Sequence, residues 1–433
     1  MSALIKLSFP IIGTSFIQMA YNLTDVLWLG RTGSSTVTAV TTAGFFLWLL
    51  IAAFYCTKSG TETLVAQSFG RKDETMARRV VENALTVSLV GSTVTCVLIL
   101  AFAPQLLGFF KLEEVVMNQA VSYLRIVSFG TCFAAMNPVL SAAYIGHGNS
   151  RTPFLINSLG LVVNIILDPI LIFGLFFLPE LGAKGAALAT VIANTIVFSV
   201  FLSRLKGNES PLGSIRLFAR PMVSIVKKIL RIGLPVSASS VAFVLFSMYI
   251  GRIVSVYGTI PLGVQNVGAS IEALSWNTAI GFSTALSSFT GQNFGAGKYE
   301  RIKKGYFCVL SLSVSLGLIA TVAFIFYGAE IFSLFSTEQE MIATGALYLK
   351  IFAVSQVFMC IEITSAGGFY GLGKTKVPAF ISIVFTGLRI PAALLVVALT
   401  TYTYDGVWWC VSISSVLKGI LVMGMYVFTL KKL

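Results

Sequence analysis

Polar residues interrupt a strongly apolar stretch at residues 153–173, and their spacing fits the binding of a cation. Asn164 and Asp168 are four residues apart, and Asn157 precedes Asn164 by seven, so on a helix all three share one face. A carboxylate at hydrocarbon depth costs at least about 2.5–3.5 kcal/mol, so we expect it to be kept for function. The stripe predicts a site for a proton or a small cation inside a membrane bundle.

A second carboxylate, Asp25, lies in another apolar stretch and shares a helix face with Tyr21 and Asn22. At about 1.5 Å per residue from the expected cytoplasmic ends, Asp25 lies about 30 Å along its helix and Asp168 about 22 Å along its own. Both carboxylates therefore fall in the outer half of the membrane.

Neutral side chains at a similar expected depth could supply further oxygen ligands. Na⁺ is a hard cation that takes ligands of this kind. Two nearby carboxylates in a medium of low dielectric can instead share one proton. A purely structural hydrogen-bond network is the third interpretation. The predicted ion-coupling set is Asp25, Asp168, Asn164, Asn22, Thr190, Asn194 and Asn137, and a Na⁺ ion would lie at Asp25, Asn164 and Asp168.

The elements that must hold these residues are membrane helices. Of 433 residues, 56% are hydrophobic and 11% are charged, whereas soluble domains carry about 25% charged residues. A helix needs about 20 apolar residues to cross a bilayer. We therefore predict an all-α integral membrane protein with twelve spans, at 5–29, 40–66, 83–105, 119–143, 153–177, 184–203, 228–257, 262–288, 306–328, 342–368, 377–400 and 405–430.

The basic residues gather on one side of these spans. Alternate connections, together with Lys6 and the C-terminal end, hold 21 of the 30 lysines and arginines. The positive-inside rule then places both termini in the cytoplasm of a multi-pass protein of the cell membrane. This asymmetry explains the net charge of +13, which does not predict nucleic-acid binding. Glu62 and Glu82 lie near the cytoplasmic helix ends, where we expect water to reach them.

The chain repeats itself with a constant offset of 225 residues, over positions that run from Pro10 to Pro153 in the first half. Each half holds six spans, so the halves enter the membrane in the same orientation. We expect two six-helix lobes related by a pseudo-twofold axis along the membrane normal. The predicted lobes are 1–205 and 228–433, joined by a cytoplasmic linker at 206–227.

The acidic positions of the first half are not repeated in the second. The offset maps Asp25 onto Ile250 and Asp168 onto Ala393, so the predicted ion site belongs to one lobe only.

The second half has charges of its own. Arg389 occupies the position of Asn164, and helical rise gives it a depth similar to that of Glu272, so we predict that Glu272 and Arg389 form an ion pair. Glu362 maps onto Asn137 and lies nearer the cytoplasm. These charges either pair structurally or contact a substrate. The predicted lining of a substrate cleft between the lobes is Tyr21, Asn157, Glu272, Arg389 and Glu362.

Four short motifs carry a family resemblance. Leu64-Val-Ala-Gln-Ser-Phe-Gly70 follows the second span and is repeated as Thr290-Gly-Gln-Asn-Phe-Gly-Ala-Gly297 after the eighth. Gly146-His-Gly-Asn-Ser-Arg-Thr-Pro153 is repeated as Gly371-Leu-Gly-Lys-Thr-Lys-Val-Pro378. In a frame of twelve spans, the chain resembles MATE (multidrug and toxic compound extrusion) transporters over its whole length, most of all the DinF-like and archaeal-type branch. The glycine-rich turns fit connections where helices approach closely.

The resemblance implies roles for particular residues. Asp25, Asn164 and Asp168 match the acidic N-lobe site of that branch, and Pro10 matches a proline at which the first helix bends on protonation. The seventh span holds no acid, unlike the NorM-like and animal branches, so the resemblance does not imply coupling in the C-terminal lobe.

We therefore predict a secondary-active antiporter, not an enzyme, that exports amphipathic and often cationic organic compounds in exchange for H⁺ or Na⁺ by rocker-type alternating access. We expect no cofactor besides the coupling ion, and a monomer whose partners are small organic substrates and the bilayer. The alternative is a lipid-linked oligosaccharide flippase of the same wider superfamily, whose cavity would hold several cations. The sequence contains no motif of an intramembrane protease.

Overall fold

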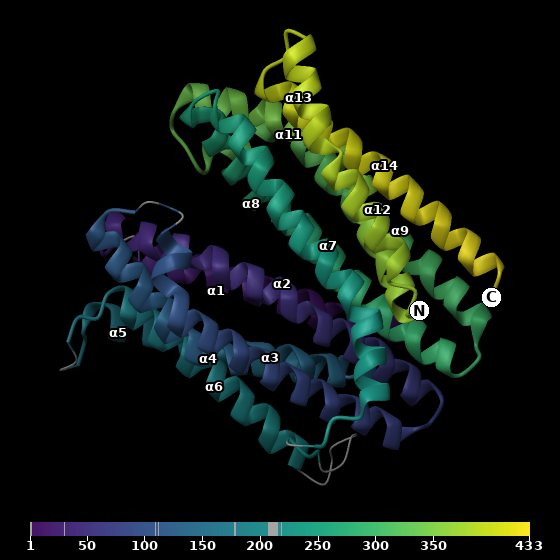
Figure 1. Cartoon of the computed structure of the whole chain (residues 1–433). Coiled ribbons are helices and arrows are strands. Elements are labelled where there is room, and N and C mark those ends of the chain that lie inside the picture. The colour runs from purple at the N-terminus through teal and green to yellow at the C-terminus, as the bar shows by residue number, and fades with distance from the viewer. Residues whose placement is uncertain are drawn as a thin grey trace. The chain divides into compact units, whose positions relative to one another are not determined.

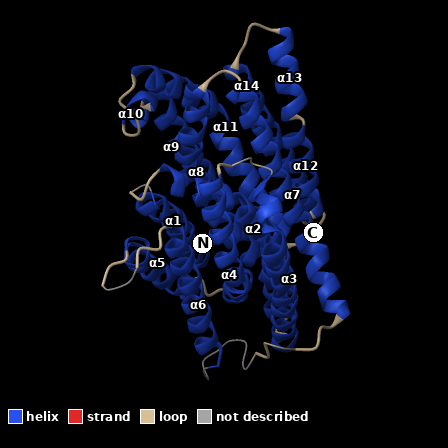
Figure 2. Cartoon of the chain, turned by 60° about the vertical axis from the view of Figure 1, so that its left-hand side comes forward, coloured by secondary structure: helices blue, strands red, loops and turns tan. Residues whose placement is uncertain are grey.

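A computed structural model describes residues 2–29, 31–108, 110, 112–176, 179–206, 215–217 and 219–433. Every regular element in this part of the chain is a helix (Figure 1, Figure 2). An apolar span has no water to bond its backbone groups, so its N–H and C=O groups pair within the span. The helices are α1 (Ser2–Leu29), α2 (Ser34–Gly70), α3 (Glu74–Gly108), α4 (Glu114–His147), α5 (Arg151–Phe173), α6 (Ala183–Lys206), α7 (Val223–Ser255), α8 (Thr259–Gly295), α9 (Tyr299–Phe326), α10 (Gly328–Ser333), α11 (Gln339–Gly371), α12 (Lys376–Gly387), α13 (Arg389–Leu399) and α14 (Tyr404–Lys431).

The predicted all-α membrane fold is confirmed, with one span divided in two. Helices α12 and α13 together make a single span, and α10 is a short helix of six residues. The division has a local cause, because Pro391 has no N–H to bond the carbonyl of Gly387. Nearby, the hydroxyl of Ser414 on α14 donates to the carbonyl of Phe385 at 2.9 Å.

Contacts between helices group the chain into two units. The N unit is Gly13–Gly233, and the C unit is Leu234–Leu433 together with Met1–Ile12. The units divide inside α1 and α7, close to Pro10 and Pro235, which the 225-residue offset relates. The lobe boundaries predicted from the sequence stay a prediction.

Helices α1 and α7 each begin in one unit and continue in the other. The first turns of α1 belong to the C unit, where Ile12 lies against Gly281 of α8. The first turns of α7 belong to the N unit, where Gly233 lies against the backbone of Cys56 on α2. Cys56 and Gly281 are 225 residues apart, so this exchange of helix ends follows the repeat.

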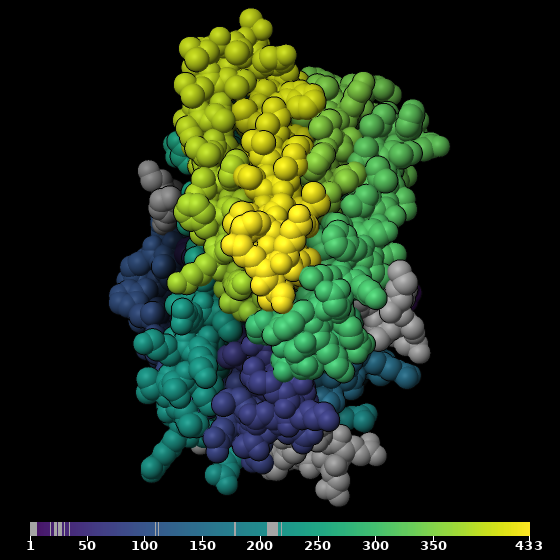
Figure 3. All heavy atoms as spheres, turned by 90° about the vertical axis from the view of Figure 1, so that its right-hand side faces the viewer, coloured from purple at the N-terminus to yellow at the C-terminus, as the bar shows by residue number. Residues whose placement is uncertain are grey.

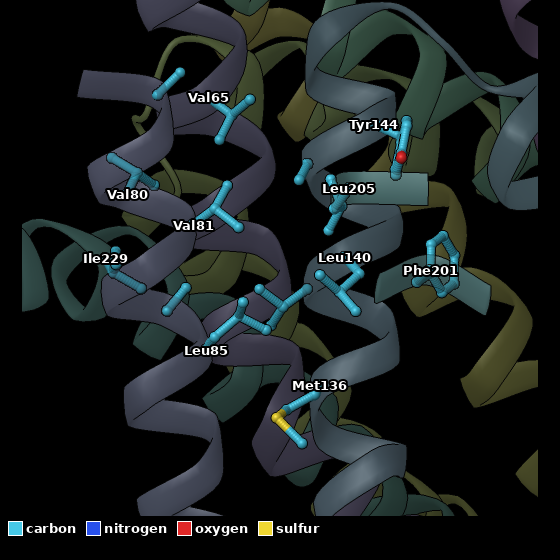
Figure 4. Packing of buried hydrophobic residues seen from close by; sticks show 14 of the residues in the cluster. Val65, Val80, Val81, Leu85, Met136, Leu140, Tyr144, Phe201, Leu205 and Ile229 are labelled. Atoms are coloured by element: carbon cyan, nitrogen blue, oxygen red, sulfur yellow. The ribbon is translucent and has the colours of Figure 1, made fainter. Parts of the chain in front are cut away.

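Each unit has two apolar cores, one toward each end of its helices. One core of the N unit joins α2, α3, α4, α6 and the start of α7, and Figure 4 shows Val65, Val81, Leu140 and Phe201 within it. The other joins α1 to α6 at their opposite ends. The candidate site is formed by polar residues on the helices between these cores.

Glycines of the repeated motifs allow close approach, as predicted. A β-carbon on Gly146 would lie 3.0 Å from the carbonyl oxygen of Glu62, and one on Gly371, the equivalent residue, would collide with a carbonyl of α8. Gly148 and Gly373 then adopt φ values of 97° and 73°, a left-handed conformation that favours glycine at a helix end.

The described end of the linker docks on α3. The backbone N–H of Arg216 donates to Glu82 at 3.0 Å, and that of Met222 donates to the side chain of Asn83 at 2.6 Å. Glu82 is therefore covered by the linker and is 8% exposed, while Glu62 lies beneath α4 and is 6% exposed. The prediction that water reaches both acids was wrong.

The surface of the C unit shows which side chains of α14 face outward and which face the inside of the bundle. Figure 3 shows α14 in yellow on this surface, beside α12 and α13. Its outward side chains are apolar, among them Ile413, Leu417 and Phe428, whereas Ser415 and Lys418 face inward and are buried. Polar residues are thus gathered inside the bundle, as expected for a lipid-facing helix.

Candidate functional site

The centre of the candidate site is one face of α5. Asn164 and Asp168 are fully buried, and the amide of Asn164 donates to the carboxylate of Asp168 at 3.2 Å. The two side chains share a face, as their spacing predicts. The amide oxygen of Asn164 is also buried and has no hydrogen-bond partner among the described residues. A buried acceptor of this kind is costly unless something donates to it or binds it.

A second polar contact joins α4 to α6. The amide of Asn137 donates to the carbonyl of Asn194 at 3.0 Å and lies 3.4 Å from its side-chain oxygen. The amide of Asn194 donates to the carbonyl of Thr190 at 2.9 Å. The side-chain oxygen of Asn137 is buried without a partner in the part of the chain that the structure describes. Two free acceptors therefore lie on neighbouring helices.

The register of α5 against α6 places these contacts at one level. A β-carbon on Gly160 would lie 2.5 Å from Val197, and Gly185 lies against the carbonyl of Leu171, so the two helices are antiparallel. When residues are counted inward from these two contacts, residue 164 of α5 lies opposite residue 193 of α6, and residue 168 lies opposite residue 189. We call the set Asn137, Asn164, Asp168, Thr190 and Asn194 the N-unit polar layer.

Helix α1 passes this layer as well. Its Gly13 lies against the ring of Phe154, and the rings of Trp28 and Phe173 are 6.2 Å apart, so α1 runs alongside α5 in the same direction. Asp25 is three residues before Trp28 and Asp168 is five residues before Phe173. Their backbones therefore differ by about 3 Å along the helices. The side chains of Asp25, Asn22 and Tyr21 lie outside the described residues.

Asn157, the third residue of the α5 stripe, bonds near the N-terminal end of α5. Its amide donates to the carbonyl of Pro153 at 2.7 Å and lies 3.4 Å from the hydroxyl of Ser141. Its place in a substrate cleft stays a prediction.

In the C unit, Glu272 is held by neighbours on α11. The hydroxyl of Tyr348 donates to one carboxylate oxygen at 2.6 Å, and the amide of Gln356 donates to the other at 3.2 Å. The hydroxyl of Ser275 donates in turn to the oxygen of Gln356 at 2.8 Å. These contacts orient the carboxylate toward α11.

Arg389 is held by a different helix. It is 6% exposed, and its guanidinium donates to the hydroxyls of Ser414 and Ser415 on α14 at 2.9 and 2.8 Å. No ion pair joins Arg389 to Glu272 among the described residues, so the predicted pair was wrong. Helical rise estimates depth along the membrane but not the direction in which each side chain leaves its helix.

The buried ion pair of the C unit is one that the sequence reading missed. Lys418 of α14 lies 3.1 Å from the carboxylate of Glu362 on α11, and the two side chains are 6% and 13% exposed. A lysine near the middle of an otherwise apolar span was the available signal.

These contacts limit the chemistry of each unit. The N-unit polar layer offers oxygen acceptors and a carboxylate, a donor set that suits Na⁺ or a proton. The C unit binds Glu272 and Glu362 with its own side chains. Groups of three or more histidine, cysteine or acidic residues that could bind a transition metal are absent from the described residues.

Comparison with known proteins agrees with the repeat. The sequence profile of the MatE family matches residues 10–170 and 235–395. The two matched stretches begin 225 residues apart, which is the offset found within the chain itself.

Individual relatives match over nearly the whole length. The "Probable multidrug resistance protein NorM" of Thermotoga maritima is 26% identical over 419 residues, which cover 94% of this chain and 87% of that protein. The "Probable multidrug resistance protein YoeA" of Bacillus subtilis is 27% identical over 429 residues, which cover 98% and 92%. A solved structure described as "Outward-facing conformation of a multidrug resistance MATE family transporter of the MOP superfamily" superposes with a TM-score of 0.92 at 23% identity, covering 99% of this chain and 96% of the other.

The structural likeness fixes the fold as that of twelve membrane-spanning helices in two lobes, and the matched structure is described as a transporter. The branch within the family stays a prediction. Because the family profile covers well over half of the residues and does so once in each repeat, this chain belongs to the MatE family of membrane transporters.

Proposed function

We propose that this protein is a secondary-active antiporter that exports amphipathic, often cationic organic compounds and takes up H⁺ or Na⁺ in exchange. The family and the names of the relatives support drug export as the task. The observation that carries the ion-coupled part is the fully buried Asn164–Asp168 contact in an otherwise apolar helix.

The coupling ion would bind in the N-unit polar layer. Asp168 supplies the charge, and the unoccupied amide oxygens of Asn137 and Asn164 are acceptors that a Na⁺ ion can use. For H⁺ coupling, Asp168 and Asp25 would share a proton, because two carboxylates at one depth in a medium of low dielectric do not both ionise readily. The backbone of Asp25 lies within about 3 Å of that of Asp168 along the helices, which supports either arrangement.

The energy available from one ion depends on the charge of the substrate. A unit charge moving through 100 mV releases about 2.3 kcal/mol, which sustains about a 50-fold gradient of an uncharged substrate. One-for-one exchange with a monovalent organic cation moves no net charge, so the concentration gradient of the coupling ion drives it. The ion would bias rocker-type alternating access between an inward-facing and an outward-facing state. In a cell membrane with cytoplasmic termini, this direction of exchange removes substrate from the cell.

The test is efflux of a fluorescent organic cation from proteoliposomes, with the H⁺ and Na⁺ gradients imposed separately. We expect Asp168→Asn and Asp25→Asn to abolish the part of efflux that depends on the gradient. The matched control is Glu340→Gln, which neutralises an exposed carboxylate in the first turn of α11. Full ion-driven efflux by both aspartate variants would sink the assignment of the site, and the gradient that drives the parent identifies the ion.

A further inference from the structure

One contact occurs in both units with different chemistry. In the N unit, Asn137 of α4 bonds Asn194 of α6, and in the C unit, Glu362 of α11 pairs with Lys418 of α14. The first members are 225 residues apart and occupy the same position of the repeat, whereas the second members are 224 apart, so Lys418 lies one residue before Gly419, the equivalent of Asn194. The fold brings two polar side chains together here, and the amide pair shows that they need not be charged.

The ion pair lies at the centre of its span. Lys418 is 14 residues after Tyr404 and 13 before Lys431, so it is about 20 Å from either end of α14. Ions cost more than amides at such depth, and a buried ion pair often stabilises no better than a neutral pair of similar size. Packing alone therefore does not explain why this position holds a lysine.

The lysine balances the charge inside the C unit. Glu272 and Glu362 are two carboxylates, and Arg389 and Lys418 are two cations, so the sum is zero when all four are ionised. The offset maps Arg389 and Glu362 onto the amides of Asn164 and Asn137, and the N-unit polar layer has the carboxylate of Asp168 and no basic residue. The two units thus have opposite requirements for an added cation.

We propose that Lys418 is a built-in counter-cation, whose ammonium permanently fills the place at Glu362 that a soluble Na⁺ or H⁺ would otherwise take. The C unit then neither binds nor releases an ion at Glu362 during a cycle, and ion exchange is confined to the N unit. The confinement of exchange rests on the proposed function, whereas the filling of the site by Lys418 does not.

The test removes the ammonium and asks whether a soluble cation replaces it. Thermal unfolding of the purified full chain is measured in detergent, in NaCl or choline chloride at equal ionic strength, at acidic and at alkaline pH. The background is Asp168→Asn, which removes the N-unit carboxylate. We expect Lys418→Gln to gain a stabilisation of about 5 °C from Na⁺ or from acid, and Glu362→Gln added to it to abolish the gain. Lys350→Gln, which changes an exposed lysine of α11, is the matched control.

The other titratable groups that act on Glu362 are Arg389 and Tyr370, and both are unchanged in these variants. A Lys418→Gln protein that responds to Na⁺ and pH as its parent does would overturn the proposal. Should this variant not fold, the charge-exchanged Glu362→Lys/Lys418→Glu protein decides. If the charge-exchanged protein folds and Na⁺ does not change its unfolding temperature, the proposal is supported. If it misfolds, or if Na⁺ changes its unfolding temperature in a way not seen in the Asp168→Asn parent, the proposal is overturned.

These readouts do not depend on transport. Efflux that ignores both ion gradients would refute the proposed function, yet a cation-dependent Lys418→Gln protein would still show that the lysine fills the site at Glu362.

Discussion

The hydroxyl of Tyr348 offers a clean test of how the C unit holds a buried acid. Tyr348→Phe removes the hydroxyl that donates to Glu272 at 2.6 Å. The ring itself would keep its place, because it stacks on Phe352 with centroids 4.3 Å apart and meets Trp408 edge-on at 4.9 Å. The substitution therefore isolates one hydrogen bond from the packing around it.

The size of the effect follows from the partner. A hydrogen bond to a charged group contributes about 1.5–3 kcal/mol, and its loss leaves the carboxylate with the amide of Gln356 as its remaining partner among the described residues. For a unit of about 200 residues, 1 kcal/mol corresponds to about 2–4 °C of unfolding temperature. We expect Tyr348→Phe to lower that temperature by about 3–12 °C.

The assay is thermal unfolding of the purified protein in detergent. Tyr402→Phe is the control, because the side chain of Tyr402 is 55% exposed. In the Glu272→Gln background, the further loss on Tyr348→Phe should be smaller, because the acceptor is then neutral. An unfolding temperature within about 1 °C of the parent for Tyr348→Phe would refute the reasoning.

Three further predictions concern packing and the linker. Gly233→Ala should cost about 1–3 kcal/mol of stability, because a β-carbon there collides with a backbone carbonyl of α2. The control is Gly251→Ala on the same helix, whose β-carbon would have its nearest neighbour 3.6 Å away. It should leave the temperature of thermal unfolding unchanged. Asn83→Ala should speed trypsin cleavage of the linker, because it removes an acceptor that ties the linker to α3; an unchanged cleavage rate would contradict this. Ser414→Ala should lower the unfolding temperature by weakening the hold on Arg389, and no change would show that the remaining serine suffices.

The sequence was sufficient to predict the helices but not their full lengths. The span predicted at 40–66 belongs to a helix, α2, that runs from Ser34 to Gly70, and that at 262–288 belongs to α8, which runs from Thr259 to Gly295. Hydropathy detects only the part of a helix inside hydrocarbon, whereas backbone hydrogen bonds continue beyond it. Hydropathy also carries no information on tertiary contacts, so it could not predict the exchange of the first turns of α1 and α7 between the units.

The site was predictable where local spacing decides it. The Asn164–Asp168 contact follows from a separation of four residues on one helix. The contact of Asn137 with Asn194 joins residues 57 apart; similar depth placed both in one candidate set, but their hydrogen bond was not predicted. Depth was not enough for Glu272, because its partners depend on which way its side chain points from α8.

The repeat separates what the fold requires from what the function requires. Each unit has a polar contact between equivalent helices, α4 with α6 and α11 with α14, and the amide contact of Asn137 with Asn194 shows that it need not be charged. A requirement of the fold would be met by the same chemistry in both halves. The halves differ instead in charge at several related positions: Asp25 and Asp168 correspond to Ile250 and Ala393, and Asn164 and Asn137 correspond to Arg389 and Glu362. The polar layer of the N unit has a carboxylate and no basic residue, whereas the C unit has Arg389 and Lys418 beside Glu272 and Glu362. Since each charge is costly at this depth, the asymmetry supports the proposal that the N unit binds the coupling ion and that Lys418 fills the corresponding role in the C unit.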